Sequence, residues 1–374
     1  MKLNFREREY ETVLAIMEQI NKDRCGLEFS GIYNILAVLG KYHTRQRGGD
    51  RAVWNIAPKS MGKGESIKYG EMFEDTNIIV KRDKITSTYF IAFVQKQQLD
   101  TVCIIIEDIS TIIDNDYHVK DFFNLASKLL WDRNIGSGTK DMLEMECENI
   151  IEMKGTTVLI GGTPKNLAHI RSFYQAYTSM WKDRITEYLY FFDNKSSEKI
   201  NSNILNSMFN TKKQEVKYFK PEDGLPEEHI EFDLRVDKSK ISMLYDQIMY
   251  NQHSPNRGQQ LISTDLKSLA WLNGREYVTE SDIYFYYLYK LNLTKSLMKR
   301  RDYLALFYAL QKPDYGYVLD NIQLSMGTLN QYLWNNPYIN WHKGDKFIKI
   351  NPEILDLLMS QRLFIDKYVT GDEK

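Results

Sequence analysis

The sequence predicts an α/β fold whose core is a mainly parallel sheet, followed by a helical region and a further C-terminal unit. Two observations support this class. Short apolar runs bounded by turn residues alternate with longer stretches of helical periodicity between about residues 51 and 193. With 374 residues, the chain is also long enough for two or three domains that each bury a core.

The individual elements follow from these patterns in chain order. Apolar residues at helical spacing predict helices over 6–22 and 32–39, and the basic, glycine-containing segment 41–51 is typical of an exposed loop. We then expect strands at 53–57, 77–80, 101–106, 157–161 and 188–192. Helices are expected at 65–73, 86–97, 119–131 and 166–181.

The second half of the chain divides at a polar stretch. From 195 to about 231, Asn, Ser, Lys and Glu dominate, which predicts a loop-rich connection. A helical region from 237 to about 293 and a third unit follow. The predicted domains are an N-terminal helical segment, an α/β core, a helical region and a C-terminal domain, over residues 1–50, 51–232, 233–293 and 294–374.

Composition favours a soluble protein of a reducing compartment. The 49 basic and 50 acidic residues give a net charge of −1, so any attraction to nucleic acid or membrane must be local. The cysteines Cys25, Cys103 and Cys147 are far apart, with neither metal-ligand spacing nor an even count for disulfides. Because no run approaches the roughly 18 apolar residues of a membrane span, we expect a cytoplasmic protein that does not enter the membrane.

The segment after the first expected strand of the core carries a chemical motif. It reads Ala57-Pro58-Lys59-Ser60-Met61-Gly62-Lys63-Gly64-Glu65-Ser66. In a P-loop, backbone N–H groups wrap the phosphates, a lysine after a glycine reaches the β/γ oxygens, and the hydroxyl that follows binds Mg²⁺. Ala57, Gly62 and Lys63 match this pattern. Gly64 takes the place of the hydroxyl residue, and Ser66 brings a hydroxyl two residues later. We expect ATP to bind along this segment with Mg²⁺ on Ser66; the alternative is a chance Gly-Lys-Gly turn.

Two acidic residues follow the strand expected over 101–106. Apolar residues and then Glu107 and Asp108 form a Walker B arrangement, in which one carboxylate holds Mg²⁺ and the next polarises the attacking water. We therefore expect Glu107 to hold Mg²⁺ and Asp108 to orient water, with their order reversed from the usual Asp-Glu. The alternative is a buried strand that ends in a solvated acidic turn. Thr163, after strand 157–161, is the candidate for contact with the γ-phosphate, or else a turn residue.

The P-loop, the acidic pair and a polar residue after the following strand, in this order, resemble the AAA+ ATPases. Residues 256–283 resemble the lid of the MCM helicases and related AAA+ proteins. An arginine begins a helix there, apolar residues follow at helical spacing, and Val-Thr-x-x-Asp-Ile opens the next helix. Thr279 and Asp282 have the spacing of a capping box. The resemblance spans about residues 50–290.

The resemblance implies further site residues. Arg257 would be the sensor 2 arginine that reaches the γ-phosphate, and the alternative is an exposed arginine at a helix start. AAA+ proteins complete the site with an arginine from the neighbouring subunit. Arg184 is the candidate for that role, with Arg133 and Arg171 as competitors. The resemblance therefore also implies a homo-oligomer, such as a hexamer or another ring.

The C-terminal unit has the order of a winged helix. Helices are expected over 297–310, 318–324 and 328–334, and strands over 339–342 and 346–350. In a winged helix, the third helix enters the DNA major groove and the hairpin contacts phosphate. The expected DNA contacts are Thr328, Asn330, Gln331, Lys343, Lys346, Lys299, Arg300 and Arg301. Winged helices also bind proteins, and charge clusters are usually solvated faces.

These observations lead to three hypotheses. The first is an AAA+ ATPase that assembles on DNA as a replication initiator, helicase loader or helicase-like motor of a virus or mobile element. The second is a non-catalytic DNA-binding or assembly protein on the same scaffold, which the incomplete P-loop favours. The third is a small-molecule kinase, which rests on Gly-Lys-Gly alone, and the expected lid and C-terminal unit argue against it.

Overall fold

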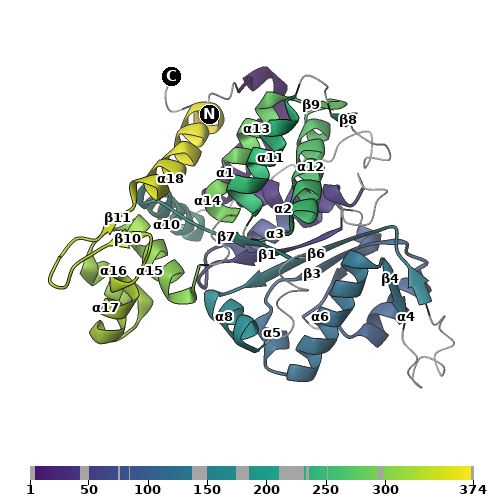
Figure 1. Cartoon of the computed structure of the whole chain (residues 1–374), viewed down its shortest axis with the longest axis horizontal. Helices are drawn as coiled ribbons and strands as arrows, with labels where there is room; N and C mark the ends of the chain where they lie inside the picture. Colours follow the sequence, from purple (N-terminus) through teal and green to yellow (C-terminus); the bar gives the residue numbers. More distant parts are fainter. Residues whose placement is uncertain are drawn as a thin grey trace.

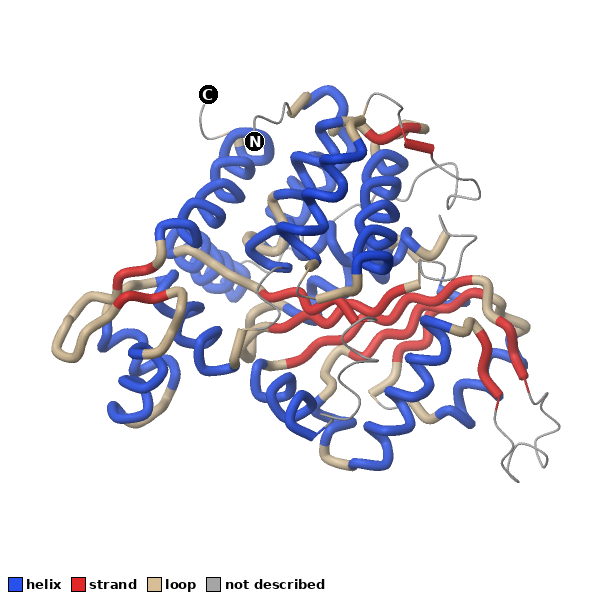
Figure 2. Tube along the Cα trace, viewed as in Figure 1, coloured by secondary structure: helices blue, strands red, loops and turns tan. Residues whose placement is uncertain are grey.

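A five-stranded parallel sheet lies at the centre of the computed structural model (Figure 1, Figure 2). The structure describes residues 5–42, 50–74, 76–83, 85–136, 150–173, 185–209, 231–232, 236–250, 252–293 and 298–371. In the order β2-β3-β6-β1-β7, the sheet contains β2 (Ile79–Lys81), β3 (Thr101–Ile106), β6 (Gly155–Gly162), β1 (Arg51–Ile56) and β7 (Ile185–Leu189). Every pairing between these strands is parallel, so the expected parallel α/β core is confirmed.

Helices cover both faces of this sheet (Figure 1). One face carries α4 (Ser87–Gln97), α5 (Ser110–Ile113), α6 (Asp116–Trp131) and α8 (Pro164–Phe173). The other carries α1 (Glu11–Arg24), α2 (Glu28–Gly40), α11 (Lys238–Leu244), α12 (Pro255–Leu272) and α13 (Glu280–Tyr287). Because both faces are covered, β1 and β6 are buried along their whole length.

Further elements complete the α/β part. Helix α3 (Lys63–Met72) packs against α2, α10 (Asn194–Phe209) follows β7, and α14 (Lys290–Leu293) contacts β7. Two small strand pairs are β4 (Asn134–Gly136) with β5 (Ile150–Glu152), and β8 (Glu231–Phe232) with β9 (Tyr277–Val278). Single turns of 3-10 helix cover Glu7–Glu9 and Thr76–Ile78, and π-helical turns cover Tyr245–Met249 and Asp366–Thr370.

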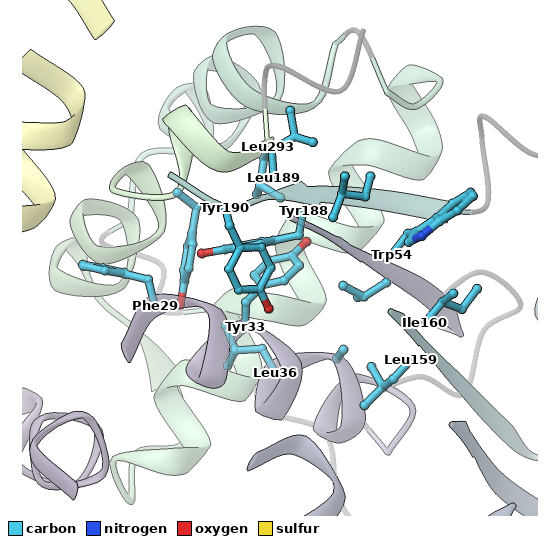
Figure 3. Close-up of a cluster of buried hydrophobic side chains, with 14 of the residues drawn as sticks. Phe29, Tyr33, Leu36, Trp54, Leu159, Ile160, Tyr188, Leu189, Tyr190 and Leu293 are labelled. Carbon is cyan, nitrogen blue, oxygen red and sulfur yellow. The ribbon is translucent and has the colours of Figure 1, made fainter. Parts of the chain in front are cut away.

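Helix α2 forms the middle of the core. All of its residues are buried, which explains why its sequence is a nearly continuous apolar run instead of an amphipathic one. The ring of Tyr33 in α2 lies 5.1 Å from that of Tyr188 in β7 and 5.2 Å from that of Tyr289. Figure 3 shows the side chains of Tyr33, Tyr188 and Tyr190 grouped close together. Such tilted ring pairs stabilise a core by about 0.5–1.5 kcal/mol each beyond the buried area.

The helical region expected over 233–293 packs on the N-terminal helices. The Tyr10 hydroxyl donates to Asp282 Oδ1 at 2.6 Å, and the Phe29 and Phe285 rings are 5.7 Å apart. The capping box expected at Asp282 is present at the start of α13. One buried core runs through the N-terminal helices, the sheet and this region. Packing therefore marks no break at residues 50 or 232, and the domain boundaries stay predictions.

The C-terminal unit has three helices and then a short hairpin, as expected. These are α15 (Arg300–Gln311), α16 (Tyr315–Ile322), α17 (Met326–Trp334) and the antiparallel pair β10 (Ile339–Asn340) and β11 (Lys349–Ile350). A last helix, α18 (Pro352–Ile365), returns to the upper helices, where Gln361 Nε2 donates to the Leu288 carbonyl at 2.7 Å. In the part of the chain that the structure describes, every helix is too short or too polar to cross a membrane.

Candidate functional site

The loop between β1 and α3 curls around a lysine. Gly62 has φ 75°, and a Cβ atom there would lie 2.9 Å from the leucine that precedes α2, so glycine is needed at this position. The Lys63 amine donates to the carbonyl oxygens of Ala57 at 3.1 Å and Pro58 at 2.9 Å. The same lysine is the first residue of α3, where free backbone N–H groups favour an anion.

A pocket of about 470 Å³ opens beside this loop. Its volume lies within the range of small-molecule sites, about 300–1,000 Å³. The loop and the start of α3 form one side, and the turn between α1 and α2 and the chain after β7 form another. The lining residues are Asp23, Arg24, Cys25, Leu27, Ser60, Met61, Gly62, Lys63, Gly64, Glu65, Glu107, Phe192 and Ile200.

The acidic pair lies at the same edge of the sheet as the loop. Strands β1 and β3 both pair in parallel with β6, so their carboxyl ends meet at one edge, where α/β sheets bind ligands. Glu107 lines the pocket together with Lys63. Burial lowers the pKa of the Lys63 amine, and the Asp108 carboxylate opposes this shift. The structure thus brings Lys63 and both acids together, while their chemical roles stay predictions.

Both acids are held by neighbouring groups. The Lys81 amine of β2 lies 2.8 Å from Glu107 Oε1 and 2.8 Å from Glu71 Oε2 of α3. The Asp108 carboxylate accepts the Ser110 backbone N–H at 2.9 Å. A Mg²⁺ ion on Glu107 would therefore share its carboxylate with the Lys81 amine or displace that amine.

The end of β6 lies directly against the end of β3. A Cβ atom on Gly161 would lie 2.0 Å from the Glu107 carbonyl oxygen, so glycine is required there. Thr163 then lies just before Pro164, the first residue of α8. Its backbone N–H donates to Asn166 Oδ1 at 3.0 Å, and its hydroxyl accepts the Asn166 N–H at 3.3 Å, as in a helix cap. Thr163 lies at the expected edge with its hydroxyl in this cap, and a γ-phosphate contact stays a prediction.

The Ser66 side chain does not line the pocket. Its side chain is fully buried, and its hydroxyl accepts a hydrogen bond from Asn34 Nδ2 at 2.9 Å. Asn34 also exchanges hydrogen bonds of 2.9 and 3.1 Å with Asn55 of β1, whose oxygen accepts the Tyr190 hydroxyl at 2.9 Å. In this conformation Ser66 therefore faces α2 and the sheet instead of the pocket, and Mg²⁺ binding by its hydroxyl stays a prediction.

Arg257 is also placed differently from the expectation. It is 3% exposed at the start of α12, and its guanidinium donates to the carbonyl oxygen of Asp50, the residue before β1. Since β1 spans 6 residues at roughly 3.3 Å each, this carbonyl lies about 20 Å from the loop at the other end of the strand. Arg257 therefore lies away from the loop in this conformation, and its sensor 2 role stays a prediction. Among the described residues that line the pocket, none belongs to the region expected to be a lid.

The three arginines considered for the site of a neighbouring subunit lie in different surroundings. Arg184 lies outside the described residues. Arg133 Nε lies 2.6 Å from Asp50 Oδ2, at the amino edge of the sheet. Arg171 pairs with Glu187 of β7 and donates to a backbone carbonyl just before α15 at 3.1 Å. Arg133 and Arg171 are thus engaged within their own chain, so the structure favours neither of them for a role in trans.

Several lining residues were not predicted from the sequence. Arg24 adds a cation to the pocket, and Leu27, Phe192 and Ile200 give it an apolar side. Gly26 was one signal, because a glycine between two helices marks a turn, and its φ is 89°. The residues after β7 carry no such signal, since only the fold brings them to the loop.

The expected DNA contacts differ in exposure. Those that are exposed are Gln331, Lys343, Lys346, Lys299 and Arg300. Asn330 accepts the Tyr315 hydroxyl at 2.8 Å, and the Thr328 and Ser325 hydroxyls share a hydrogen bond of 2.9 Å at the start of α17. Arg301 pairs with the aspartate beside it at 3.2 Å. DNA contact by any of these residues stays a prediction.

Sequence comparison does not assign the chain to a family: none of the protein-family models matches it, and neither does any curated protein. Within the described ranges, no three His, Cys, Asp or Glu side chains lie close enough to hold a metal ion by themselves. A Mg²⁺ ion at this pocket would therefore depend on phosphate oxygens together with Glu107, which is how proteins commonly bind Mg²⁺.

Proposed function

We propose that the protein binds a nucleoside triphosphate in the pocket beside the β1–α3 loop and hydrolyses it to act on DNA. The observation that carries the proposal is the meeting of Lys63 and Glu107 on one pocket, with Asp108 acting on the same amine. The strand order adds support. The strand that ends before Thr163 lies between the loop strand β1 and the acid strand β3, so all three carboxyl ends face one site.

Binding rests on the lysine and the start of α3. In the free site, the Lys63 amine contacts the neutral carbonyls of Ala57 and Pro58. Phosphate oxygens replace these neutral acceptors with charged ones, and charge-assisted hydrogen bonds are about twice as strong. Backbone N–H groups at the start of α3 add to this attraction. The apolar side of the pocket, with Phe192 and Ile200, is suited to the flat face of a base.

Hydrolysis rests on the two acids. Glu107 would hold Mg²⁺, which neutralises charge on the phosphates when bound. Asp108 lies beside the amine that contacts those phosphates, and a carboxylate there orients a water and accepts its proton. In this proposal the pocket positions the reacting groups and stabilises charge, which is most of what phosphoryl transfer requires from a protein.

Replacing Lys63 tests the binding step. Lys63→Ala is expected to weaken nucleotide binding by about 10- to 150-fold. This range corresponds to the loss of one hydrogen bond to a charged group, which contributes roughly 1.5–3 kcal/mol. Isothermal titration calorimetry with ATP and Mg²⁺ measures this loss. Lys96→Ala is the control, because Lys96 is exposed on α4, outside the loop, and does not line the pocket. Equal affinities of Lys63→Ala and the wild type would contradict the proposed site.

A second candidate function is nucleotide binding without turnover. The burial of Ser66, the position of Arg257 and the Lys81–Glu107 ion pair favour it, because each removes a group expected to act on phosphate or metal. Measuring ATP turnover with and without DNA, beside the Asp108→Asn variant, separates the two functions. Turnover by the wild type that the variant loses supports hydrolysis, and equal background rates support binding alone.

The proposed action on DNA rests on the C-terminal unit. It resembles a winged helix in the order of α15, α16, α17 and the hairpin, and Lys343 and Lys346 are exposed on that hairpin. Since residues 325–335 of α17 and its ends carry no charge, phosphate contacts would come from the hairpin and the cluster 299–301. Fluorescence anisotropy across salt concentrations tests this. Removing each phosphate-contacting lysine should lower the salt slope by about 1.

The last part of the proposal concerns the class of the protein and its assembly into an oligomer. We place the protein among the AAA+ ATPases as a replication initiator, helicase loader or helicase-like motor that forms a homo-oligomeric ring. The motif order and the strand order support this placement. Mass photometry with a non-hydrolysable ATP analogue and DNA tests the ring. A monomer under all these conditions would contradict it and would leave the nucleotide site itself standing.

A further inference from the structure

The first helix of the C-terminal unit lies directly behind the nucleotide pocket. Tyr303, Phe307 and Gln311 recur every four residues along α15 and therefore share one face. The Tyr303 hydroxyl donates to the carbonyl of Tyr190 at 2.8 Å and to the carbonyl of Ile56 at 3.2 Å. Ile56 is the last residue of β1, so α15 is attached to the point where the phosphate loop begins.

The next two residues of this face contact the pocket wall. The rings of Phe307 and Phe192 are 6.0 Å apart in an edge-to-face arrangement, and Phe192 lines the pocket. The Ser197 hydroxyl donates to Gln311 Oε1 at 3.2 Å. Ser197 belongs to the first turn of α10, one turn before the pocket residue Ile200. One helix face thus contacts both the loop and the wall of the same pocket.

The rest of the C-terminal unit also contacts α15. Gln311 Oε1 also accepts the Tyr317 hydroxyl of α16 at 3.1 Å. The side chain of Asn336, just after α17, donates to the Asp302 carbonyl of α15 at 3.0 Å. Helix α15 is therefore the element between the pocket and the helices and hairpin beyond it.

We propose that α15 couples ligand binding in the pocket to the conformation of the C-terminal unit through Tyr303, Phe307 and Gln311. The inference rests on the proposed function, because it takes a nucleotide as the ligand. A ligand that shifts the loop or Phe192 changes the contacts of α15 with both. By thermodynamic linkage, a partner bound to the C-terminal unit then changes nucleotide affinity by the same factor.

Hydrogen exchange on the full chain tests the coupling. Saturating non-hydrolysable ATP analogue with Mg²⁺ is expected to slow amide exchange across 300–334 by about fivefold or more, the lower end of usual couplings. Tyr303→Phe keeps the ring and removes the hydroxyl, so it should still bind the analogue and lose much of this response. Tyr308→Phe on the same helix is the matched control, because the Tyr308 hydroxyl donates to neither the Ile56 nor the Tyr190 carbonyl. A wild type that binds the analogue with unchanged exchange at 300–334, or a Tyr303→Phe variant that responds like the wild type, would overturn the proposal.

A second arm needs no nucleotide, so it separates failure of the coupling from failure of the proposed function. A Cβ atom on Gly26 would lie 3.0 Å from Ile200 Cδ1 and 3.1 Å from Phe192 Cε1, so Gly26→Ala moves the pocket wall. We expect altered exchange at 300–311. Gly274→Ala is the matched control, because Gly274 also has positive φ, of 66°, but open space around its Cβ position. Ile200→Ala, which loosens the wall instead, covers the case in which Gly26→Ala fails to fold. Altered exchange at the wall with unchanged exchange at 300–311 would refute the coupling.

Discussion

Removing the carboxylate of Asp265 is expected to destabilise the protein strongly, because it breaks a buried ion pair between α12 and β1. Asp265 pairs with Arg51, the first residue of β1, and neither side chain has any exposed surface. Burial raises the pKa of the Asp265 carboxyl, and the Arg51 guanidinium opposes that shift. The guanidinium also lies 5.1 Å from the centre of the Tyr33 ring. This pair holds the region expected to be a lid at the edge of the sheet away from the β1–α3 loop.

The magnitude follows from what each variant leaves behind. Asp265→Ala leaves the Arg51 charge buried without its partner, which destabilises by about 3–5 kcal/mol. The ring of Tyr33 offsets part of this through a cation–π contact of roughly 0.5–2 kcal/mol, so we expect a loss near 3 kcal/mol. The double variant Arg51→Met/Asp265→Leu removes both charges at similar volume. It should lie within about 1 kcal/mol of the wild type or exceed it in stability.

Urea unfolding followed by far-UV circular dichroism measures both free energies of unfolding. Glu18→Ala supplies the surface control, since it breaks the exposed Lys22–Glu18 pair and should cost no more than about 0.5 kcal/mol. If Asp265→Ala lowers the free energy of unfolding by less than about 1 kcal/mol, the reasoning is refuted, because a buried charge without its partner should destabilise the protein by more than that. A double variant as unstable as the single one would show that the loss comes from packing instead of charge.

Three further predictions concern the site and the core. Gly161→Ala forces a Cβ atom toward the Glu107 carbonyl and should destabilise by about 1–3 kcal/mol in a thermal melt, whereas the open Gly327 position should tolerate alanine. Burial lowers the pKa of the Lys63 amine in the free site from its ordinary value. Nucleotide affinity should therefore be highest at pH values below that pKa and should fall as pH rises through the pKa of the amine in the bound state. A fluorescence titration that finds the same affinity from neutral to alkaline pH would argue against a role for the lysine. Burial raises the pKa of the Cys103 thiol to about 11, so mass spectrometry should find it unalkylated by iodoacetamide at pH 8 until the protein unfolds.

The sheet was predictable because its strands are short, apolar and separated by helical periods. The largest displacement is at β7, expected over 188–192 and found at Ile185–Leu189. Thr186 and Glu187 made the start of this strand look polar. The Thr186 hydroxyl lies 3.1 Å from His253 Nε2, and the Glu187 backbone N–H donates to Gln252 Oε1 at 3.0 Å. These partners come from a distant part of the chain, so a local pattern cannot include them.

The positions of the candidate site residues were predictable where they follow the end of a strand. They were not predictable where they depend on how a helix packs against the rest of the core. Lys63 and the acids Glu107 and Asp108 follow β1 and β3, and parallel strands bring their ends to one edge. Ser66 and Arg257 are different cases, because the phase of a helix and the direction of its packing decide what a side chain contacts. The sequence around Arg257 resembles a lid, yet its helix meets the opposite edge of the sheet.

Under the proposed function, the contacts around the acids determine whether a bound nucleotide can be hydrolysed. Lysine and backbone N–H groups contact phosphate before and during reaction alike, so they favour affinity more than rate. Faster hydrolysis requires groups that stabilise the charge that develops in the transition state, and Arg257 and Ser66 are both buried away from the pocket. The Lys81–Glu107 pair is a weaker obstacle, since the two side chains are 35% and 41% exposed and such pairs contribute no more than about 1 kcal/mol. A nucleotide with bound Mg²⁺ can therefore displace Lys81, whereas Arg257 would have to leave a buried contact about 20 Å away. Turnover in this conformation must then depend on Glu107 and Asp108, and Asp108→Asn should abolish it without weakening binding.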